Sequence, residues 1–249
     1  MVDAPNDPRT ARLETNVARV RERVAAACKQ ACRGVEEVRI VGVTKYVDAA
    51  DTARLLACGL TDLGESRPQL LWEKAAALSE HAPAARWHMI GHMQRNKLRR
   101  TLPTLSLLHS LDSQRLLTAV AEEAARLGRP CTALIEVNLT GAPERSGVSF
   151  EELDRLAAAA AASDWIQLAG LMGMADKPEP GGDSARRQFA RLREARDRLQ
   201  GLFVAYDERP GPPGELSLGM SGDFADAILE GSTMVRIGSV LWEGLLPAG

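Results

Sequence analysis

The chain has 249 residues, 45% of them hydrophobic and 26% charged, and a formal net charge of −2. An α/β barrel takes about 250 residues as one domain, so the length suits a single barrel with a buried core. Its 31 basic and 33 acidic residues give no positive field that would attract a phosphate backbone or an anionic bilayer. The composition therefore argues against nucleic acid and membrane partners and favours small ligands.

The first residues show neither the basic nor the apolar region of a secretory signal, and no stretch approaches 18 apolar residues. We therefore expect a cytoplasmic protein. The four cysteines contain no CxxC pair, and a chain of this length needs no disulfide bonds. We expect all four to be reduced thiols. Cys28 and Cys32 lie one helical turn apart, but no matching His or Cys pair lies nearby to complete a metal site.

The first predicted element is a helix over about residues 8–33. Asp7 is a suitable cap, Pro8 suits the first turn, and apolar residues recur at spacings of four, three and four. These apolar residues are Leu13, Val17, Val20 and Val24. The pattern predicts one apolar helix face.

From residue 38 onward, short apolar runs and amphipathic segments alternate eight times. The expected strands cover 38–44, 62–64, 86–91, 105–111, 131–139, 166–174, 216–220 and 234–238. The expected helices cover 48–58, 67–79, 94–100, 113–127, 150–162, 184–202 and 223–229, and a short terminal segment follows the last strand. Strands of this kind, each followed by a helix, indicate a parallel sheet covered by helices.

Eight such units predict the α/β class and a single (β/α)8 TIM barrel over about residues 38–244, with an additional N-terminal helix. We expect one domain over 1–249. An open doubly wound sheet would place a GxGxxG turn after the first strand, where this chain has Thr44, Lys45 and Tyr46. The closed barrel is therefore the preferred architecture.

Lys45 is the most informative candidate for function, because functional groups of such barrels follow the strands. The chain has 26 arginines and five lysines, and only Lys45 ends a predicted interior strand. The other lysines, Lys29, Lys74, Lys97 and Lys177, are expected to be solvated. An amine in a barrel mouth loses hydration, which favours its neutral, nucleophilic form and a Schiff base with an aldehyde or ketone. The alternative is a strand-end lysine that reaches solvent or pairs with Glu65.

A second signal lies in the last two strand-to-helix loops. LGMSGD at 218–223 and VRIGS at 235–239 place Gly and Ser where helices are expected to begin. Backbone N–H groups at such positions bind anions, and these loops frequently bind phosphate in barrels. Ordinary helix capping explains either loop alone, whereas both together favour phosphate.

Two further motifs carry less functional information. His88 and His92 have the HxxxH spacing of some zinc sites, but that spacing joins two ligands on a helix, and this segment is predicted to be a strand and a turn. For His92 and His109 we expect structural, hydrogen-bonded roles. The basic run at 94–100 is expected to be a solvated helix face, with phosphate steering or partner binding as the alternative.

A Schiff-base lysine and a double phosphate loop in one barrel together indicate a phosphorylated aldehyde, and pyridoxal 5′-phosphate is the obvious candidate. Five blocks of the sequence also resemble the pyridoxal phosphate homeostasis protein family. They are VTK at 43–45, LGESRPQ at 63–69, WHMIGHMQRNK at 87–97, LGMSGD at 218–223 and GSTMVRIGS at 231–239. The resemblance runs in order from about residue 17 to residue 244.

This resemblance implies a barrel like the N-terminal domain of alanine racemase that binds pyridoxal 5′-phosphate through Lys45. It implies a carrier or buffer for vitamin B6 homeostasis without established turnover. Ser221, Gly238 and Ser239 would hold the phosphate, Arg236 would face the pyridine nitrogen, and His88 would lie near the ring. Ser66 stands where the family usually has an Asn near the cofactor's phenolic oxygen. We expect a monomer whose partners are the cofactor and recipient apoenzymes.

Two enzymatic alternatives remain. An amino-acid racemase needs a second acid/base on the opposite ring face, which the resembling racemases take from a separate β domain. We expect no room for that domain before Gly249, and Tyr46 should point away from Lys45 if the strand continues. A Schiff-base aldolase acting on a sugar phosphate would need a carboxylate for proton transfer, for which Glu65 is available.

Overall fold

Eight parallel strands close into a barrel in the computed structural model, which describes residues 7–79, 84–176, 184–208 and 213–246. Each strand pairs with the next one along the chain, and the last pairs with the first. The strands are β1 (Arg39–Val43), β2 (Asp62–Glu65), β3 (Arg86–Met89), β4 (Leu105–Leu111), β5 (Cys131–Val137), β6 (Ile166–Gly173), β7 (Glu215–Ser217) and β8 (Met234–Ile237). The predicted (β/α)8 fold is confirmed.

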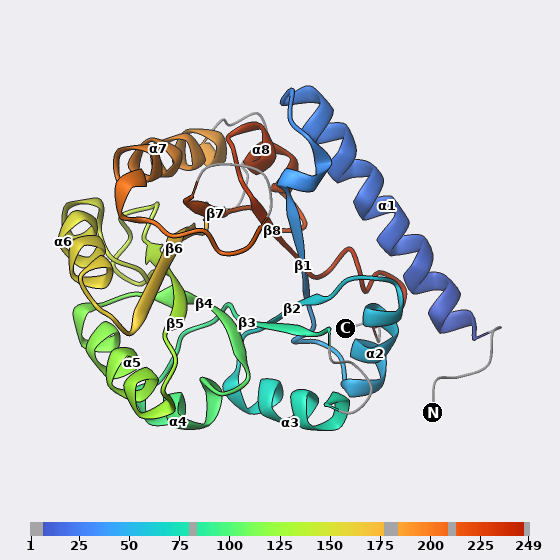
Figure 1. The fold of residues 1–249 in the computed structure, drawn as a ribbon. Coiled ribbons are helices and arrows are strands. Elements are labelled where there is room, and N and C mark those ends of the chain that lie inside the picture. Colours follow the sequence, from blue (N-terminus) through green and yellow to red (C-terminus); the bar gives the residue numbers. More distant parts are fainter. Residues whose placement is uncertain (1–6, 80–83, 177–183, 209–212, 247–249) are drawn as a thin grey trace.

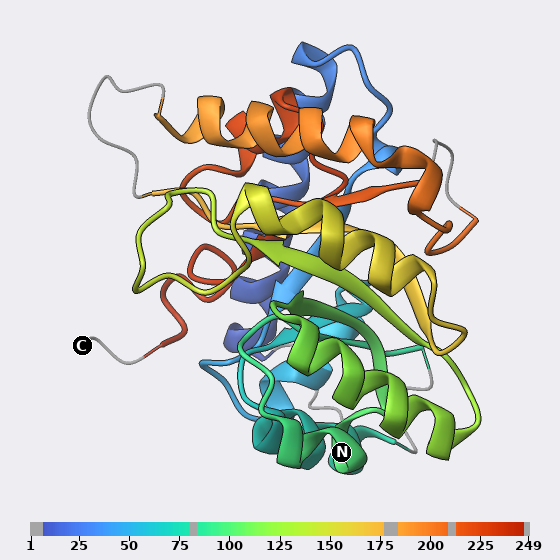
Figure 2. The same cartoon turned by 90° about the vertical axis from the view of Figure 1, so that its left-hand side faces the viewer.

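The α-helices lie outside the strands, and Figure 1 shows them around the barrel. They are α1 (Pro8–Gln30), α2 (Ala49–Ala57), α3 (Pro68–Leu78), α4 (Leu98–Thr101), α5 (Gln114–Leu127), α6 (Phe150–Ala161), α7 (Ser184–Arg198) and α8 (Phe224–Leu229). Figure 2 shows α5, α6 and α7 side by side across one outer face. Short 3-10 helices cover Val35–Glu37, Arg95–Lys97 and Gln200–Leu202.

The predicted N-terminal helix is present and packs against the barrel. The Asp7 side chain accepts a hydrogen bond from the Arg9 amide, and Pro8 occupies the first turn of α1. The four apolar residues at helical spacing are all buried. The helix ends at Gln30 rather than near residue 33, because Cys32 adopts a left-handed conformation with φ of 54°.

Apolar side chains form two separate clusters. The large one fills the space between strands and helices and includes Ala133 and Ile135 of β5, whereas Leu134, between them, belongs to a smaller cluster. Side chains alternate along a strand, so the smaller cluster lies inside the barrel. Its members are Leu107, Leu134, Ala169, Met172 and Met234. Much of the remaining interior is polar, unlike the apolar layers usual in such barrels.

Two predicted helices differ from those observed. The segment at 94–100 forms a 3-10 turn followed by the four-residue α4, since Pro103 cannot donate the next helical hydrogen bond. The segment at 184–202 is α7 followed by a 3-10 turn. After β8 the chain forms turns that begin at Gly238, because Leu241 and Trp242 are held in the core. The Trp242 indole N–H donates to the Val43 carbonyl at 2.8 Å.

Candidate functional site

Lys45 lies in a turn just beyond the end of β1. The strand ends at Val43, and the Lys45 side chain is exposed, with its Nζ 4.8 Å from the centroid of the Tyr46 ring. The predicted desolvation of this amine is therefore wrong. Tyr46 does not point away either, because the strand stops before the alternation of side chains reaches it. The amine is accessible from solvent at the carboxyl end of the barrel.

The residue before Lys45 is held by a buried ion pair. Thr44 Oγ1 donates to Glu65 Oε1 at 2.6 Å, and Lys74 Nζ donates to the Thr44 carbonyl oxygen at 2.6 Å. Lys74 also forms an ion pair with Glu65, and the two side chains are only 4% and 0% exposed. The expectation that Lys74 is solvated is wrong, since α3 turns it toward β2. Glu65 pairs with Lys74, not with Lys45. The contacts of Glu65 and Lys74 with Thr44 fix the backbone from which Lys45 projects.

The loops after β7 and β8 meet at Ser221. Its Oγ accepts hydrogen bonds from the backbone N–H groups of Gly238 at 3.2 Å and Val240 at 3.5 Å. Ser239 is exposed beside them. The sequence predicted helix starts at both loops, but only the six-residue α8 follows the first loop. The Ser221 and Ser239 hydroxyls, together with the two N–H groups that Ser221 Oγ occupies here, are donors of the kind that bind a phosphate group.

Arg236 on β8 is buried inside the barrel. Its Nη1 donates to the Ser217 carbonyl oxygen at 2.6 Å and to Ser217 Oγ at 2.7 Å, and its Nη2 donates to the Gly173 carbonyl oxygen at 3.0 Å. A guanidinium has five N–H groups. Among the described residues no acceptor takes the Nε–H or the second Nη2–H. Burial lowers the pKa of Arg236 to about 10, against the opposing charge of Asp223, so the group stays charged at neutral pH.

His88 lies wholly inside the barrel. One ring nitrogen is 2.9 Å from Asp62 Oδ1 and the other is 2.9 Å from His109 Nε2. Burial lowers the pKa of His88, despite the hydrogen bond to Asp62, and lowers that of His109 well below its usual value. His109 has the structural role that the sequence predicted. Sequence reasoning missed Asp62 and Ser217, and the available signal was a polar residue at an interior position of each predicted strand.

Ser66 and His92 occupy different places at the barrel rim. Ser66 is half-buried just beyond β2, and its hydroxyl has no hydrogen-bond partner among the described residues. His92 is exposed and lies 3.1 Å from Asp112, away from the interior His88. The HxxxH pair therefore does not converge, and within the described ranges no group of His, Cys, Asp and Glu is arranged to hold a metal ion.

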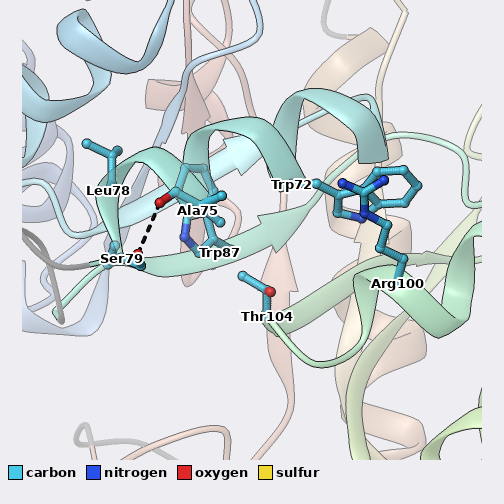
Figure 3. A pocket seen from close by; sticks show the side chains of 9 residues that line it. Trp72, Ala75, Leu78, Ser79, Trp87, Arg100 and Thr104 are labelled. Carbon is cyan, nitrogen blue, oxygen red and sulfur yellow. Dashed lines mark hydrogen bonds between the residues drawn. The ribbon is translucent and has the colours of Figure 1, made fainter.

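The site residues gather around neighbouring strands. Lys45, Ser66, Ser221 and the Gly238–Ser239 pair follow β1, β2, β7 and β8, which are adjacent in the closed barrel. A cavity of about 490 Å³ lies elsewhere, outside the barrel near the beginnings of β3 and β4. Figure 3 shows Trp72, Trp87 and Arg100 among its lining side chains, with Arg100 stacked on Trp72. It opens at the end of the strands opposite to Lys45.

Comparisons with known proteins show the family to which the chain belongs. The model of the alanine racemase N-terminal domain matches residues 10–245. A pyridoxal phosphate homeostasis protein of Mycobacterium tuberculosis is 34% identical over 250 residues, which cover 94% of this chain and 93% of the relative. The chain belongs to the pyridoxal phosphate homeostasis protein family. The resemblance seen in the sequence is thereby confirmed.

The fold of this family member is also similar to solved structures. PipY of Synechococcus elongatus, in a structure with pyridoxal phosphate bound, has a TM-score of 0.70 at 28% identity, covering 89% of this chain and 99% of PipY. An alanine racemase of Clostridium difficile shares the fold alone, with a TM-score of 0.69 at 14% identity, and this chain covers 56% of it. Among the described helices none is long and apolar enough to span a membrane.

Proposed function

We propose that this protein binds pyridoxal 5′-phosphate and carries or buffers it for intracellular vitamin B6 homeostasis. The observation that carries the proposal is the buried Arg236 on β8, two of whose N–H groups have no acceptor among the described residues. It lies close in sequence to the amides that converge on Ser221. A buried cation with free donors and a cluster of backbone N–H groups fit a ligand with a basic ring nitrogen and a phosphate. The relatives' names and the ligand of PipY support this choice.

Each site residue would contact a different part of the cofactor. Ser221, Gly238 and Ser239 would hold the phosphate, and Arg236 would donate to the ring nitrogen. Lys45 would provide the amine that condenses with the aldehyde of the bound cofactor, with loss of one water. Ser66, whose hydroxyl has no partner within the described ranges, would lie near the phenolic oxygen.

We propose that the protein does not turn over amino acids. Arg236 donates a hydrogen bond but is too weak an acid at neutral pH to protonate the ring nitrogen, and a neutral pyridine withdraws electrons poorly from an amino-acid carbon. A racemase also needs a second acid/base opposite the lysine, whereas Tyr46 lies beside the Lys45 amine. We further propose a cytoplasmic monomer that supplies recipient apoenzymes.

Reductive trapping tests the binding proposal. The protein is mixed with pyridoxal 5′-phosphate, reduced with borohydride and digested, and the labelled peptides are identified by mass spectrometry. We expect the label at Lys45, its loss in Lys45→Ala and its retention in the control Lys97→Ala. A label mainly on Lys97 or Lys177 would contradict the assignment. In parallel, incubation of the loaded protein with L-alanine in deuterated water should give neither deuterium exchange at the α-carbon nor D-alanine.

A further inference from the structure

A chain of hydrogen bonds crosses the barrel interior from β2 to β8. Asp62 Oδ1 lies 2.9 Å from His88 Nε2, and His88 Nδ1 lies 2.9 Å from His109 Nε2. His109 Nδ1 lies 2.9 Å from Ser217 Oγ, which accepts from Arg236 Nη1 at 2.7 Å. All five residues are buried. They connect the amino-terminal end of β2 with the arginine assigned to the cofactor's ring.

Two arginines hold Asp62, the acidic end of this hydrogen-bonded chain, in place. Arg39 Nη1 donates to both oxygens of Asp62 at 2.8 Å, and Arg86 Nη2 donates to Oδ2 at 2.7 Å. Two guanidinium groups therefore keep Asp62 a hydrogen-bond acceptor. Arg39 also forms an ion pair with Asp207, so a second carboxylate holds the guanidinium that binds Asp62.

The acceptor at Asp62 determines the direction of every following hydrogen bond. Neutral imidazole carries one N–H, and His88 must place it on Nε2 to donate to Asp62. His88 Nδ1 then accepts, so His109 carries its proton on Nε2 and accepts at Nδ1. The Ser217 hydroxyl is left to donate to His109, and its oxygen lone pair faces Arg236. One consistent set of protons thus satisfies the whole chain.

We propose that Asp62 is a positioning residue for the cofactor's ring nitrogen, acting through the fixed tautomers of His88 and His109 and the orientation of Ser217. With the Ser217 oxygen held as an acceptor, Arg236 is restrained from one side. The two N–H groups that meet no acceptor in the described part of the chain are then directed at the ligand. His88 then acts through Arg236 and needs no contact of its own with the cofactor. The inference rests on the proposed function, which assigns Arg236 to the ring.

Nitrogen-15 NMR of the histidines tests the chain without any variant or ligand. In protein labelled with ¹⁵N-histidine at pH 7.5, two-bond correlations distinguish the tautomers of neutral imidazole. We expect His88 and His109 both to carry the proton on Nε2. A proton on Nδ1 of either residue, or a doubly protonated His88, would reverse the hydrogen bonds and overturn the proposal.

Variants test the transmission to Arg236. Asp62→Asn should alter the His88 and His109 spectra. Both Asp62→Asn and Ser217→Ala should weaken pyridoxal 5′-phosphate binding about tenfold. In metal sites, loss of a residue that orients a ligand weakens metal affinity about 10- to 100-fold, and we expect the lower end of that range here. The ¹⁵N shift of ring-labelled cofactor should change as well. The matched control is Asp112→Asn, which removes the exposed aspartate–histidine pair with His92 and should leave the buried tautomers and affinity unchanged. Wild-type affinity and ring shift in folded Ser217→Ala would overturn the role of Ser217.

Two failures remain distinguishable. If the wild-type protein does not bind pyridoxal 5′-phosphate, the proposed function fails, whatever the tautomers are. If it binds the cofactor and Asp62→Asn leaves tautomers, affinity and ring shift unchanged, only the positioning role fails. Circular dichroism and unfolding of each variant show that the comparison is made on folded protein.

Discussion

Two lysines near the end of β1 have opposite environments. Lys45 is exposed and carries no ion pair in the described structure, whereas Lys74 is buried against Glu65 and Thr44. The second oxygen of Glu65, Oε2, is buried and has no hydrogen-bond partner in the described part of the chain. Lys74 is therefore the charge that compensates this carboxylate, and removal of one partner of a buried pair leaves the other uncompensated.

Replacement of Lys74 should be strongly destabilising. We expect Lys74→Met to lower the free energy of unfolding by about 3–5 kcal/mol, because the Glu65 charge stays buried without its partner. The double variant Lys74→Met with Glu65→Gln should lose less than Lys74→Met alone. Urea unfolding of the wild type and of both variants measures these free energies. The control Lys29→Met, at an exposed helix position, should change stability by less than about 0.5 kcal/mol, and an equally small effect of Lys74→Met would contradict a buried ion pair.

At the scale of elements, the pairing of β5, β6 and β7 depends on one glycine. The register of β5 with β6 shifts between Ala133 and Leu134, and Gly170 on β6 has a φ of 154°. A Cβ atom there would lie 2.0 Å from the Glu215 carbonyl oxygen of β7. No side chain fits, because the obstacle is backbone in the neighbouring strand.

Gly170→Ala should therefore disrupt the barrel wall, with a loss of more than about 4 kcal/mol or failure to fold. Gly128→Ala is the matched control, since Gly128 also has positive φ, 76°, but a Cβ there meets no atom of the described residues within 4 Å. It should cost only about 1–2 kcal/mol for the left-handed conformation. Thermal and urea unfolding of the two variants compares these costs. Similar losses would show that β6 and β7 separate more readily than their pairing implies.

On the scale of the whole molecule, the buried histidines make stability depend on pH. Burial lowers the pKa values of both His88 and His109, so the unfolded chain binds protons more readily than the folded protein below the unfolded value of about 6.5. Stability is therefore fully present above that pH and declines as pH falls toward the folded pKa values. Burial raises the pKa values of Glu136 and Asp223, and these groups oppose the decline.

We expect the free energy of unfolding to decrease between pH 6.5 and pH 5, with up to about 1.4 kcal/mol per pH unit from each buried histidine. Urea unfolding at several pH values measures the slope. His109→Gln should reduce it by the share of one histidine. A slope that His109→Gln does not alter would mean that this imidazole gains a proton in the folded state as readily as in the unfolded chain.

The sequence alone determined the barrel, the start of the N-terminal helix and the residues that follow each strand, because apolar periodicity, Asp7 and Pro8 act within a few neighbouring positions. Parallel strands are apolar on both faces, so their pattern does not distinguish the interior from the helix-covered side. Only closure of the barrel decided that Lys74 is buried, that Lys45 is exposed, and that side chains from β2, β3, β4, β7 and β8 form one hydrogen-bonded chain. Burial and partnership depend on residues far apart in the chain, such as Arg39 and Met234, which the pairing of β8 with β1 brings together.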